Sequence, residues 1–403
     1  MEQVQDIVIV GGGLAGLSAA LGLHRKGIKS LVLESSDSLR SAGFAFTTWT
    51  NAWRALDALG IGDILRHRHL RLLRGTASSS SSGAVTSNLM LTEEGKLGEH
   101  EIRCVRRNIL LETMEKELPQ GTIRYSSKVV SIEEEGQLKL LHLADGSILK
   151  TKVLVGCDGV NSVIAKSLGL KKPSFSGRLA SRGFATFPDG HGFKPDFAQY
   201  MGHGFRAGVL PCDEKDIYWF FTWTPNAQEK EVEQNALQTK EFLLRKLSMA
   251  EVPKEVIQVV EKSEMGIPFS SPLRFRSPWD LIWGIISKGN VCIAGDALHS
   301  MTPDLGQGGC SALEDGVVLA RCLGDALLER EGAKGEYERI TEALSKYASM
   351  RRWRSFELVT TALILGIIQQ SDGAIMSFLR DKCLASILAR RYLKAADYDC
   401  GKL

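Results

Sequence analysis

A glycine-rich turn near the start of the chain limits the fold more than any other feature. Asp6–Val10 (DIVIV) predicts a short strand buried on both faces, and Leu14–Lys26 has apolar residues at helical spacing. Between them, Gly11, Gly13 and Gly16 form the pattern G-x-G-x-x-G. The first glycine permits a sharp turn, the second lets the backbone approach a pyrophosphate, and the third lets the helix pack close to the strand. The pattern therefore predicts a βαβ unit that binds a dinucleotide.

The next strand supports this interpretation. Ser30–Glu34 (SLVLE) is strand-like and ends in an acid 18 residues after Gly16. A carboxylate at this place accepts hydrogen bonds from a ribose diol and disfavours a 2′-phosphate. The residues therefore favour FAD or NAD over NADP at this site, and they leave the choice between FAD and NAD open.

Two later strands also end in Gly and Asp. Val153–Gly156 is followed by Asp158-Gly159, and Val291–Ala294 is followed by Gly295-Asp296. In open α/β sheets, ligands gather at the carboxyl ends of the strands. Each turn alone is also explained as a tight strand-to-helix connection without a ligand. Three of them at three strand ends favour a binding site.

The segment after Asp296 contains a second cluster of glycines. Gly306, Gly308 and Gly309 precede an apolar helix that begins near Ser311. They leave backbone N–H groups bare at the helix start, which suits a pyrophosphate or an electron-rich ring edge.

Composition excludes several other classes. The 403 residues are 44% hydrophobic, so the chain is not of the disordered type. The 50 Lys and Arg residues against 47 Asp and Glu residues give no argument for nucleic acid. The eight cysteines form no C-x-x-C pair, which leaves a metal site or a thioredoxin-like pair unsupported. The amino terminus lacks a signal-peptide pattern, so we expect free thiols and a cytoplasmic location.

Local patterns predict the elements between these motifs. We expect a helix over 108–118, strands over 122–133 and 138–143, and a helix over 239–247. The serine-rich stretch 77–87 predicts a flexible surface loop.

The carboxyl-terminal region raises the question of a membrane. The stretch 358–371 has no charge for 14 residues, but a spanning helix needs about 20. From residue 340 onward there are ten basic and six acidic residues. We therefore expect no integral membrane segment, and two alternatives stay open, a buried helix and a peripheral contact of the C-terminal helices.

Together these motifs resemble the group A flavoprotein monooxygenases of the para-hydroxybenzoate hydroxylase superfamily, and within it the plant branch that is similar to salicylate hydroxylases and zeaxanthin epoxidases. The resemblance covers nearly the whole chain and includes an Arg-x-x-Leu element at Arg107 and Leu110. The residues that it implies as contacts of FAD are Gly11, Gly13, Leu14, Ala15, Gly16, Glu34, Ser35, Arg40, Gly43, Phe44, Arg107, Val129, Asp158, Gly159, Asp296, Pro303, Gly306, Gln307, Gly308 and Gly309.

The resemblance implies an α/β fold, with a Rossmann-like FAD-binding domain, an inserted antiparallel-sheet substrate domain and C-terminal helices. We expect the FAD-binding domain at 1–75, 95–175 and 270–345, and the substrate domain at 176–269 with the 76–94 loop nearby. A C-terminal helical region then covers 346–403.

The implied activity is the hydroxylation or epoxidation of a small aromatic or other electron-rich compound with O₂. NADPH or NADH would reduce FAD and leave, and a flavin C4a-hydroperoxide would transfer oxygen. No second G-x-G-x-x-G is present, which argues against a resident nicotinamide domain. An FAD-dependent oxidative cyclase or oxidase of the same fold is the alternative, and the chain is expected to be a monomer or a homodimer.

The substrate site is the least determined part. Strand alternation puts Phe221 and Trp223 on one face, and together with Phe269 and Pro303 they are the predicted substrate contacts, although such a stripe is more often core. His299 is considered as a general base and Cys310 as a nucleophile, against the simpler interpretation that both are packed residues. The resemblance assigns no catalytic residue.

Overall fold

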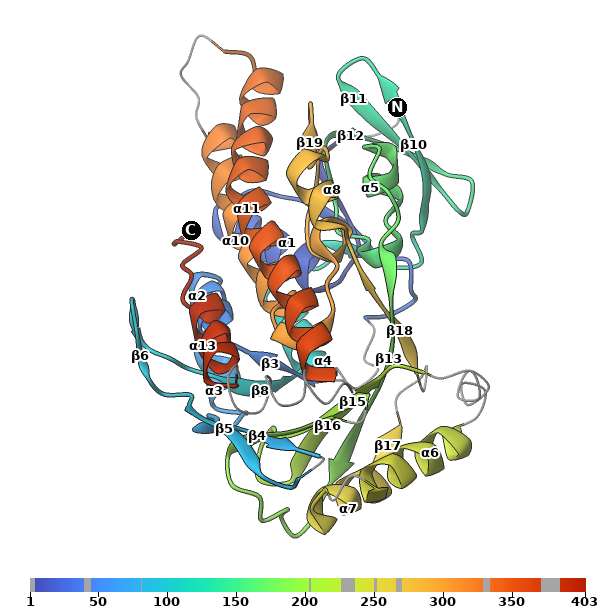
Figure 1. Ribbon diagram of the computed structural model, residues 1–403. Helices are drawn as coiled ribbons and strands as arrows, with labels where there is room; N and C mark the ends of the chain where they lie inside the picture. Colours follow the sequence, from blue (N-terminus) through green and yellow to red (C-terminus); the bar gives the residue numbers. More distant parts are fainter. Residues whose placement is uncertain are drawn as a thin grey trace.

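Two eight-stranded sheets form the scaffold of the computed structural model. In Figure 1 the first sheet lies in the upper half of the molecule, and the second lies below it with α6 and α7 on its far side. The structure describes residues 4–39, 45–80, 82–202, 204–225, 236–249, 252–265, 270–328, 334–370 and 385–403.

The first sheet has a parallel centre because its strands are apolar and buried on both faces. β1 pairs in parallel with β12 and β2, and β12 pairs in parallel with β20. Its strands are β1 (Gln5–Val10), β2 (Leu31–Leu33), β9 (Ile123–Arg124), β10 (Val129–Glu135), β11 (Leu138–Leu143), β12 (Ile148–Gly156), β19 (Ser287–Lys288) and β20 (Val291–Ile293).

The helix that follows β1 packs unusually close to a helix from the far end of the chain. α1 (Leu14–Arg25) meets α10 (Gly308–Leu328) through small residues. A Cβ at Gly316 would lie 2.0 Å from the Ser18 Oγ, and one at Gly22 would lie 2.7 Å from the Ala320 Cβ. This close crossing brings the glycine cluster near residue 308 to the glycine-rich turn near residue 11.

The second sheet is mostly antiparallel. β13 pairs with β16, β16 with β15, and β15 with β14. Its strands are β4 (Arg74–Ser79), β5 (Val85–Met90), β13 (Ser174–Thr186), β14 (Asp196–Gly202), β15 (Phe205–Pro211), β16 (Asp216–Trp223), β17 (Glu264–Met265) and β18 (Ser271–Phe275).

Other elements connect and cover the sheets. The two small ribbons are β3 (Ala45–Thr48) with β8 (Arg103–Arg106), and β6 (Glu94–Gly95) with β7 (Gly98–Glu99). The remaining helices are α2 (Thr50–Ala58), α3 (Gly62–Arg66), α4 (Arg107–Lys116), α5 (Val163–Ser167), α6 (Ala236–Met249), α7 (Lys254–Lys262), α8 (Pro278–Trp283), α9 (Asp296–His299), α11 (Glu336–Gln370) and α13 (Ala385–Ala396), with 3-10 turns η1 (Gly159–Asn161) and η3 (Pro303–Leu305).

Two local predictions were wrong. The strand expected over 122–133 is broken into β9 and β10, because Ser126 takes a positive φ of 52° and the two pieces pair with different strands. The serine-rich stretch is largely a hairpin, because β4 pairs with β14 on one side and β5 on the other, and these ladders outweigh the low strand propensity of serine. The predicted helices at 108–118 and 239–247 are confirmed as α4 and α6.

The carboxyl-terminal region is helical where it is described. α11 runs as one helix across the domain limit expected near residue 345, and the other domain limits stay predictions. Among the helices of the described residues, none is long and apolar enough to cross a membrane.

Candidate active site

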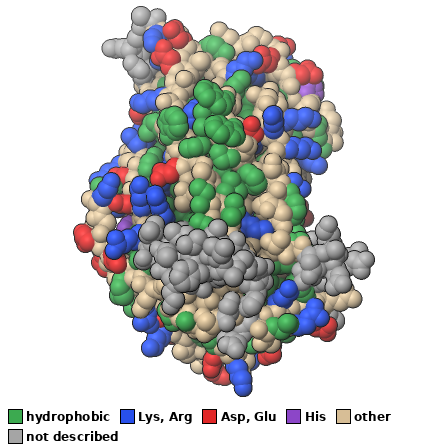
Figure 2. Space-filling model, in the orientation of Figure 1, with side chains coloured by type: hydrophobic (Ala, Val, Ile, Leu, Met, Phe, Trp, Pro, Cys, Tyr) green, Lys and Arg blue, Asp and Glu red, His purple; other side chains and the backbone are tan. Residues whose placement is uncertain are grey.

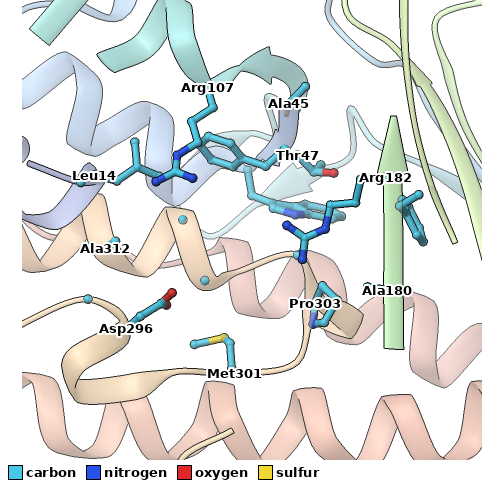
Figure 3. Close-up of a pocket in the computed structure, with 18 of the residues that line it drawn as sticks. Leu14, Ala45, Thr47, Arg107, Ala180, Arg182, Asp296, Met301, Pro303 and Ala312 are labelled. Atoms are coloured by element: carbon cyan, nitrogen blue, oxygen red, sulfur yellow. The ribbon is translucent and has the colours of Figure 1, made fainter. Parts of the chain in front are cut away.

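A cavity of about 350 Å³ lies between the glycine-rich turns of the first sheet and one face of the second sheet. Figure 3 shows Arg107 and Arg182 extending into it from different elements, with Asp296 and Met301 on another side. Its lining combines the α1 turn, the segment 295–312 and strands β13 to β16. The lining residues are Gly13, Leu14, Ala15, Ala45, Phe46, Thr47, Trp49, Arg107, Cys157, Gly159, Ala180, Arg182, Phe197, Arg206, Tyr218, Phe220, Thr222, Gly295, Asp296, Met301, Pro303, Gly306, Gly308, Gly309, Ala312 and Tyr392.

The three motif glycines differ in what surrounds them. A Cβ at Gly11 would lie 2.3 Å from the Cys157 carbonyl oxygen, and one at Gly16 would lie 1.9 Å from the Gly11 carbonyl oxygen. A Cβ at Gly13 would meet no described atom within 4 Å, and Gly13 begins α1 without a side-chain cap. The first and third glycines therefore allow the turn to pack directly on neighbouring backbone. The second leaves the N-terminus of the helix open toward the cavity.

Glu34 fixes the shape of this turn. Its Oε2 accepts a hydrogen bond from the Gly12 backbone N–H at 2.8 Å, and its Oε1 accepts one from Ser36 N–H at 2.9 Å. Glu34, Ser35 and Val129 are not among the cavity-lining residues. Their predicted contacts with a cofactor stay predictions.

The two predicted aspartates have different surroundings. Asp158 directly precedes η1, and its carboxylate reaches the start of α5, where it accepts hydrogen bonds from the Ser162 hydroxyl at 2.5 Å and from Val163 N–H at 2.6 Å. Burial raises the pKa of this carboxyl, and those hydrogen bonds oppose the rise. Asp296 is exposed and lines the cavity. Asp296 is thus the aspartate free to meet a ligand directly.

The glycine cluster near residue 308 also lies at the cavity. Gly306, Gly308 and Gly309 line it together with Pro303. Gln307 points elsewhere, because its side-chain oxygen accepts a hydrogen bond from Asn51 Nδ2 at 2.8 Å. Any contact of Gln307 with a ligand at the cavity would therefore use its backbone.

A group of buried charged side chains lies behind the glycine cluster, on the side away from the cavity. Asp315 accepts hydrogen bonds from Gly295 N–H at 2.7 Å, from His299 Nε2 at 2.8 Å and from Arg351 Nε at 2.5 Å. Glu314 pairs with Arg351 at 2.7 Å. All four side chains have no measurable exposure. They tie α9, α10 and α11 together directly behind the cavity wall.

The pKa shifts of the two acids follow from this arrangement. Burial raises the pKa of both carboxyls, but Arg354 and Arg351 at Glu314, and His299 and Arg351 at Asp315, outweigh that effect. Both pKa values therefore lie below the usual range, and both groups are charged in the folded protein.

Neither His299 nor Cys310 lines the cavity. His299 is completely buried and hydrogen-bonded to Asp315, which favours the packing interpretation over that of a general base. Burial raises the pKa of the Cys310 thiol to about 12. That thiol is therefore protonated and unreactive, as the packing interpretation expects.

The predicted substrate contacts Phe221 and Trp223 lie on the wrong face of their strand. Both belong to the core that the second sheet forms with α6 and α7, and Phe221 stacks on Phe205 at 4.9 Å. Alternation then gives the cavity Tyr218 and Phe220 instead. The aromatic stripe is core, the alternative named from the sequence.

The residues that sequence reasoning missed are on this cavity face. Arg182 and Arg206 come from β13 and β15, on either side of β16. A signal was present, because charged residues on strands that are otherwise buried indicate a polar site. Tyr392 joins the lining from α13, where its ring stacks on Trp49 at 5.6 Å, and the sequence gives no local sign of this contact.

Four further predicted site residues, Arg40, Gly43, Phe44 and Phe269, lie outside the described residues.

Comparison with known proteins supplies the family. The family described as "FAD binding domain" matches residues 4–353. The chain belongs to this family. Monooxygenase 2 of Arabidopsis thaliana is 51% identical over 410 residues, which is 100% of this chain and 99% of the relative. Monooxygenase 1 of the same plant is 36% identical over 417 residues, with both chains covered in full.

Solved structures agree in fold. HpxO of Klebsiella pneumoniae, in complex with FAD and uric acid, superposes with a TM-score of 0.81 at 23% identity, over 98% of this chain and 96% of that chain. A salicylate hydroxylase substrate complex gives a TM-score of 0.72 at 20% identity, over 98% of both chains. The protein is an FAD-dependent flavoprotein monooxygenase, and the α/β fold expected from the sequence is confirmed.

The described residues fit FAD. The open space over Gly13 and over Gly159, where a Cβ would also meet no described atom within 4 Å, allows a ligand to approach the backbone closely. The N-terminus of α1 and the Arg107 guanidinium lie at the same cavity and suit the negative charges of a pyrophosphate.

Proposed function

We propose that this monooxygenase inserts one oxygen atom from O₂ into a small planar aromatic acid, with NADPH or NADH as the electron donor. The observation that carries the proposal is the presence of two arginines, Arg182 and Arg206, at the sheet end of a cavity whose other end fits FAD. When bound, FAD supplies the redox chemistry and the activation of oxygen.

In this proposal the cofactor end of the cavity is built from backbone. Gly13, Leu14 and Ala15 at the start of α1 would face the pyrophosphate with Arg107, and Asp296 would accept hydrogen bonds from a hydroxyl-bearing chain. The predicted cofactor contacts that do not line the cavity would shape this end or hold the nucleotide further out. These are Gly11, Gly16, Glu34, Ser35, Val129, Asp158 and Gln307.

The glycine cluster near residue 308 would lie against the ring end. Pro303, Gly306, Gly308 and Gly309 would keep bulky side chains out of that part of the cavity, beside Gly159. Trp49, Phe220 and Met301 would exclude water from the reacting atoms.

Arg206 is the residue best placed to hold an anionic group. It is almost completely buried, and two of its nitrogens donate to the Gln199 side-chain oxygen at 3.0 and 2.7 Å. Its Nη1 lies 3.6 Å from Asp304 and has no hydrogen-bond partner among the described residues. Asp304 is already satisfied by both terminal nitrogens of Arg178, at 2.9 and 2.7 Å. The Nη1 of Arg206 is thus a buried donor without a hydrogen-bond partner, and a shift of this side chain toward the cavity would let it bind a carboxylate.

A substrate held in this way would lie flat. The Arg206 Cζ lies 4.9 Å from the centroid of the Phe220 ring. Ala180 and Thr222 line the same sheet face, and their small side chains leave it nearly flat. A planar aromatic ring fits such a surface, and the carboxylate on Arg206 would orient it toward the cofactor end.

The proposal is tested by anaerobic stopped-flow reduction of the flavin. The FAD-loaded protein is mixed with NADPH or NADH in the presence of a panel of aromatic acids, and the visible flavin absorbance is followed. We expect one nucleotide to reduce the flavin, faster when a suitable acid is bound. Flavin that neither nucleotide reduces with any acid of the panel would favour the oxidative cyclase or oxidase alternative.

The anionic contact predicts a specific loss in Arg206→Gln. Removing a charge-assisted hydrogen bond should weaken binding of the best aromatic acid about 10- to 100-fold, measured by titrating the flavin spectrum. Salicylate and salicylamide are a suitable acid and amide pair, because the variant should bind the neutral amide as the unchanged protein does. Arg245→Gln, at an exposed position on α6, is the control. Equal loss for acid and amide would contradict the assigned contact.

A further inference from the structure

Three tryptophans stand exposed on one side of the molecule. Trp279 and Trp283 of α8 are 68% and 80% exposed, and Trp353 of α11 is 62% exposed. With Ile285 and Met350, which are also exposed, they form what we call the tryptophan patch. Figure 2 shows hydrophobic side chains gathered over α8 and α11, with basic and some acidic side chains at the borders of this area.

The two helices that carry the patch are fixed to each other. The Arg352 Nη1 donates to the backbone carbonyls of Leu281 at 2.7 Å, Ile282 at 2.8 Å and Gly284 at 3.0 Å. This arginine therefore satisfies the open carboxyl end of α8 from the neighbouring α11. The two helices therefore hold the backbones that carry the tryptophan patch in fixed relative positions.

The exposed apolar area of the patch is large compared with the surface of a typical monomer. A whole indole side chain presents about 250 Å², so the three tryptophans alone expose on the order of 500 Å². That is near the upper end, about 300–600 Å², of the largest apolar patch on a typical monomer. Trp279 and Trp283 lie four residues apart and point to the same side of α8. Such an arrangement indicates an interaction surface.

Basic residues border the patch. The backbone carbonyl oxygen of Lys171 accepts a hydrogen bond from the Arg276 Nη1 at 2.7 Å, and Arg276 lies two residues before α8. Lys346 lies two helical turns before Trp353, on the same face of α11. The exposed basic residues near the patch are Lys171, Lys172, Arg274, Lys288 and Lys346, and the acids near it are Asp280, Glu342 and Glu357.

We propose that the tryptophan patch docks the protein on the surface of a membrane that contains anionic phospholipids. Indole rings favour the headgroup region of a bilayer, where the apolar ring is buried and the polar edge stays wet. The basic border adds attraction to anionic headgroups. The patch would insert only to the depth of its side chains.

The basic residues at the border of the tryptophan patch argue against a second copy of this chain as the partner that covers it. A twofold dimer centred on the patch would place the same surface of both copies face to face. The basic borders would then oppose each other, and like charges across an interface disfavour association. An anionic surface is complementary to the same border.

Vesicle cosedimentation of the FAD-loaded protein tests the proposal. We expect binding to vesicles of phosphatidylcholine with phosphatidylserine, weaker binding to phosphatidylcholine alone, and a decrease with added salt. The double variant Trp283→Ser, Trp353→Ser should lower the partition coefficient at least about ten-fold. The matched control is Val85→Ser, Leu97→Ser, at two exposed apolar positions outside the patch.

A charge variant gives a second readout. Lys171→Gln with Lys172→Gln should lower binding about five-fold per charge removed, whereas Lys96→Gln with Lys254→Gln, at exposed positions outside the patch, should not. Sedimentation velocity without lipid is measured in parallel. No binding to anionic vesicles, or a dimer that the tryptophan substitutions dissociate, would overturn the proposal.

Discussion

The substitution Gly13→Glu is expected to abolish FAD binding while leaving the protein folded. Gly13 begins α1 and lines the cavity, and a Cβ there would meet no described atom within 4 Å, so a side chain would extend into the cavity. A carboxylate at this place would occupy the space for the pyrophosphate and repel its charge. We expect the purified variant to be colourless and to take up no FAD in a fluorescence titration.

The control for this substitution separates the site from the fold. The circular dichroism spectrum of Gly13→Glu should match that of the FAD-free unchanged protein. Gly335→Glu, at an exposed glycine where a Cβ also meets no described atom within 4 Å, should bind FAD normally. A yellow Gly13→Glu protein with FAD in stoichiometric amount would contradict the assignment of the turn.

The substitution Arg351→Met should lower the free energy of unfolding by about 3–5 kcal/mol. Arg351 pairs with Asp315 at 2.5 Å and with Glu314 at 2.7 Å, and all three side chains are completely buried. Its removal leaves two buried carboxylates with too few positive partners, which is the costly way to break a buried ion pair. Urea unfolding of the FAD-free protein measures the loss.

The same variant should change the dependence of stability on pH. The pKa values of Glu314 and Asp315 lie below the usual range in the folded protein, because the nearby cations outweigh burial. Their contribution to stability is therefore present above the unfolded pKa of about 4 and is lost as the pH falls through the folded pKa. Arg351→Met should show less of this acid loss.

An exposed arginine provides the comparison for this substitution. Arg390→Met, on α13, should change the free energy of unfolding by less than about 0.5 kcal/mol. A loss below 1 kcal/mol in Arg351→Met would show that the buried charges do not hold α10 and α11 together.

The glycine-rich turn was predictable because its constraints are local. Gly11 and Gly16 are required by contacts within a few residues or with the adjacent strand, and the strand and helix around them have clear periodicity. The helix α4 is similar, since its limits follow from its own sequence pattern.

The substrate end of the cavity was not predictable in the same way. Alternation along β16 shows that odd and even residues face opposite sides, but not which side faces the cavity. That choice is made by α6 and α7, which cover Phe221 and Trp223. The contact of Tyr392 with Trp49 joins residues far apart in the sequence, so only the folded chain reveals it.

The most direct test of the central claim is the origin of the oxygen atom in the product. The FAD-loaded protein is supplied with NADPH or NADH, the aromatic acid that most accelerates flavin reduction, and oxygen-18 gas, and the product is analysed by mass spectrometry. We expect one labelled oxygen atom per product molecule, with one nicotinamide nucleotide consumed for each. A product without label, formed together with hydrogen peroxide, would contradict monooxygenation and identify an oxidase or cyclase.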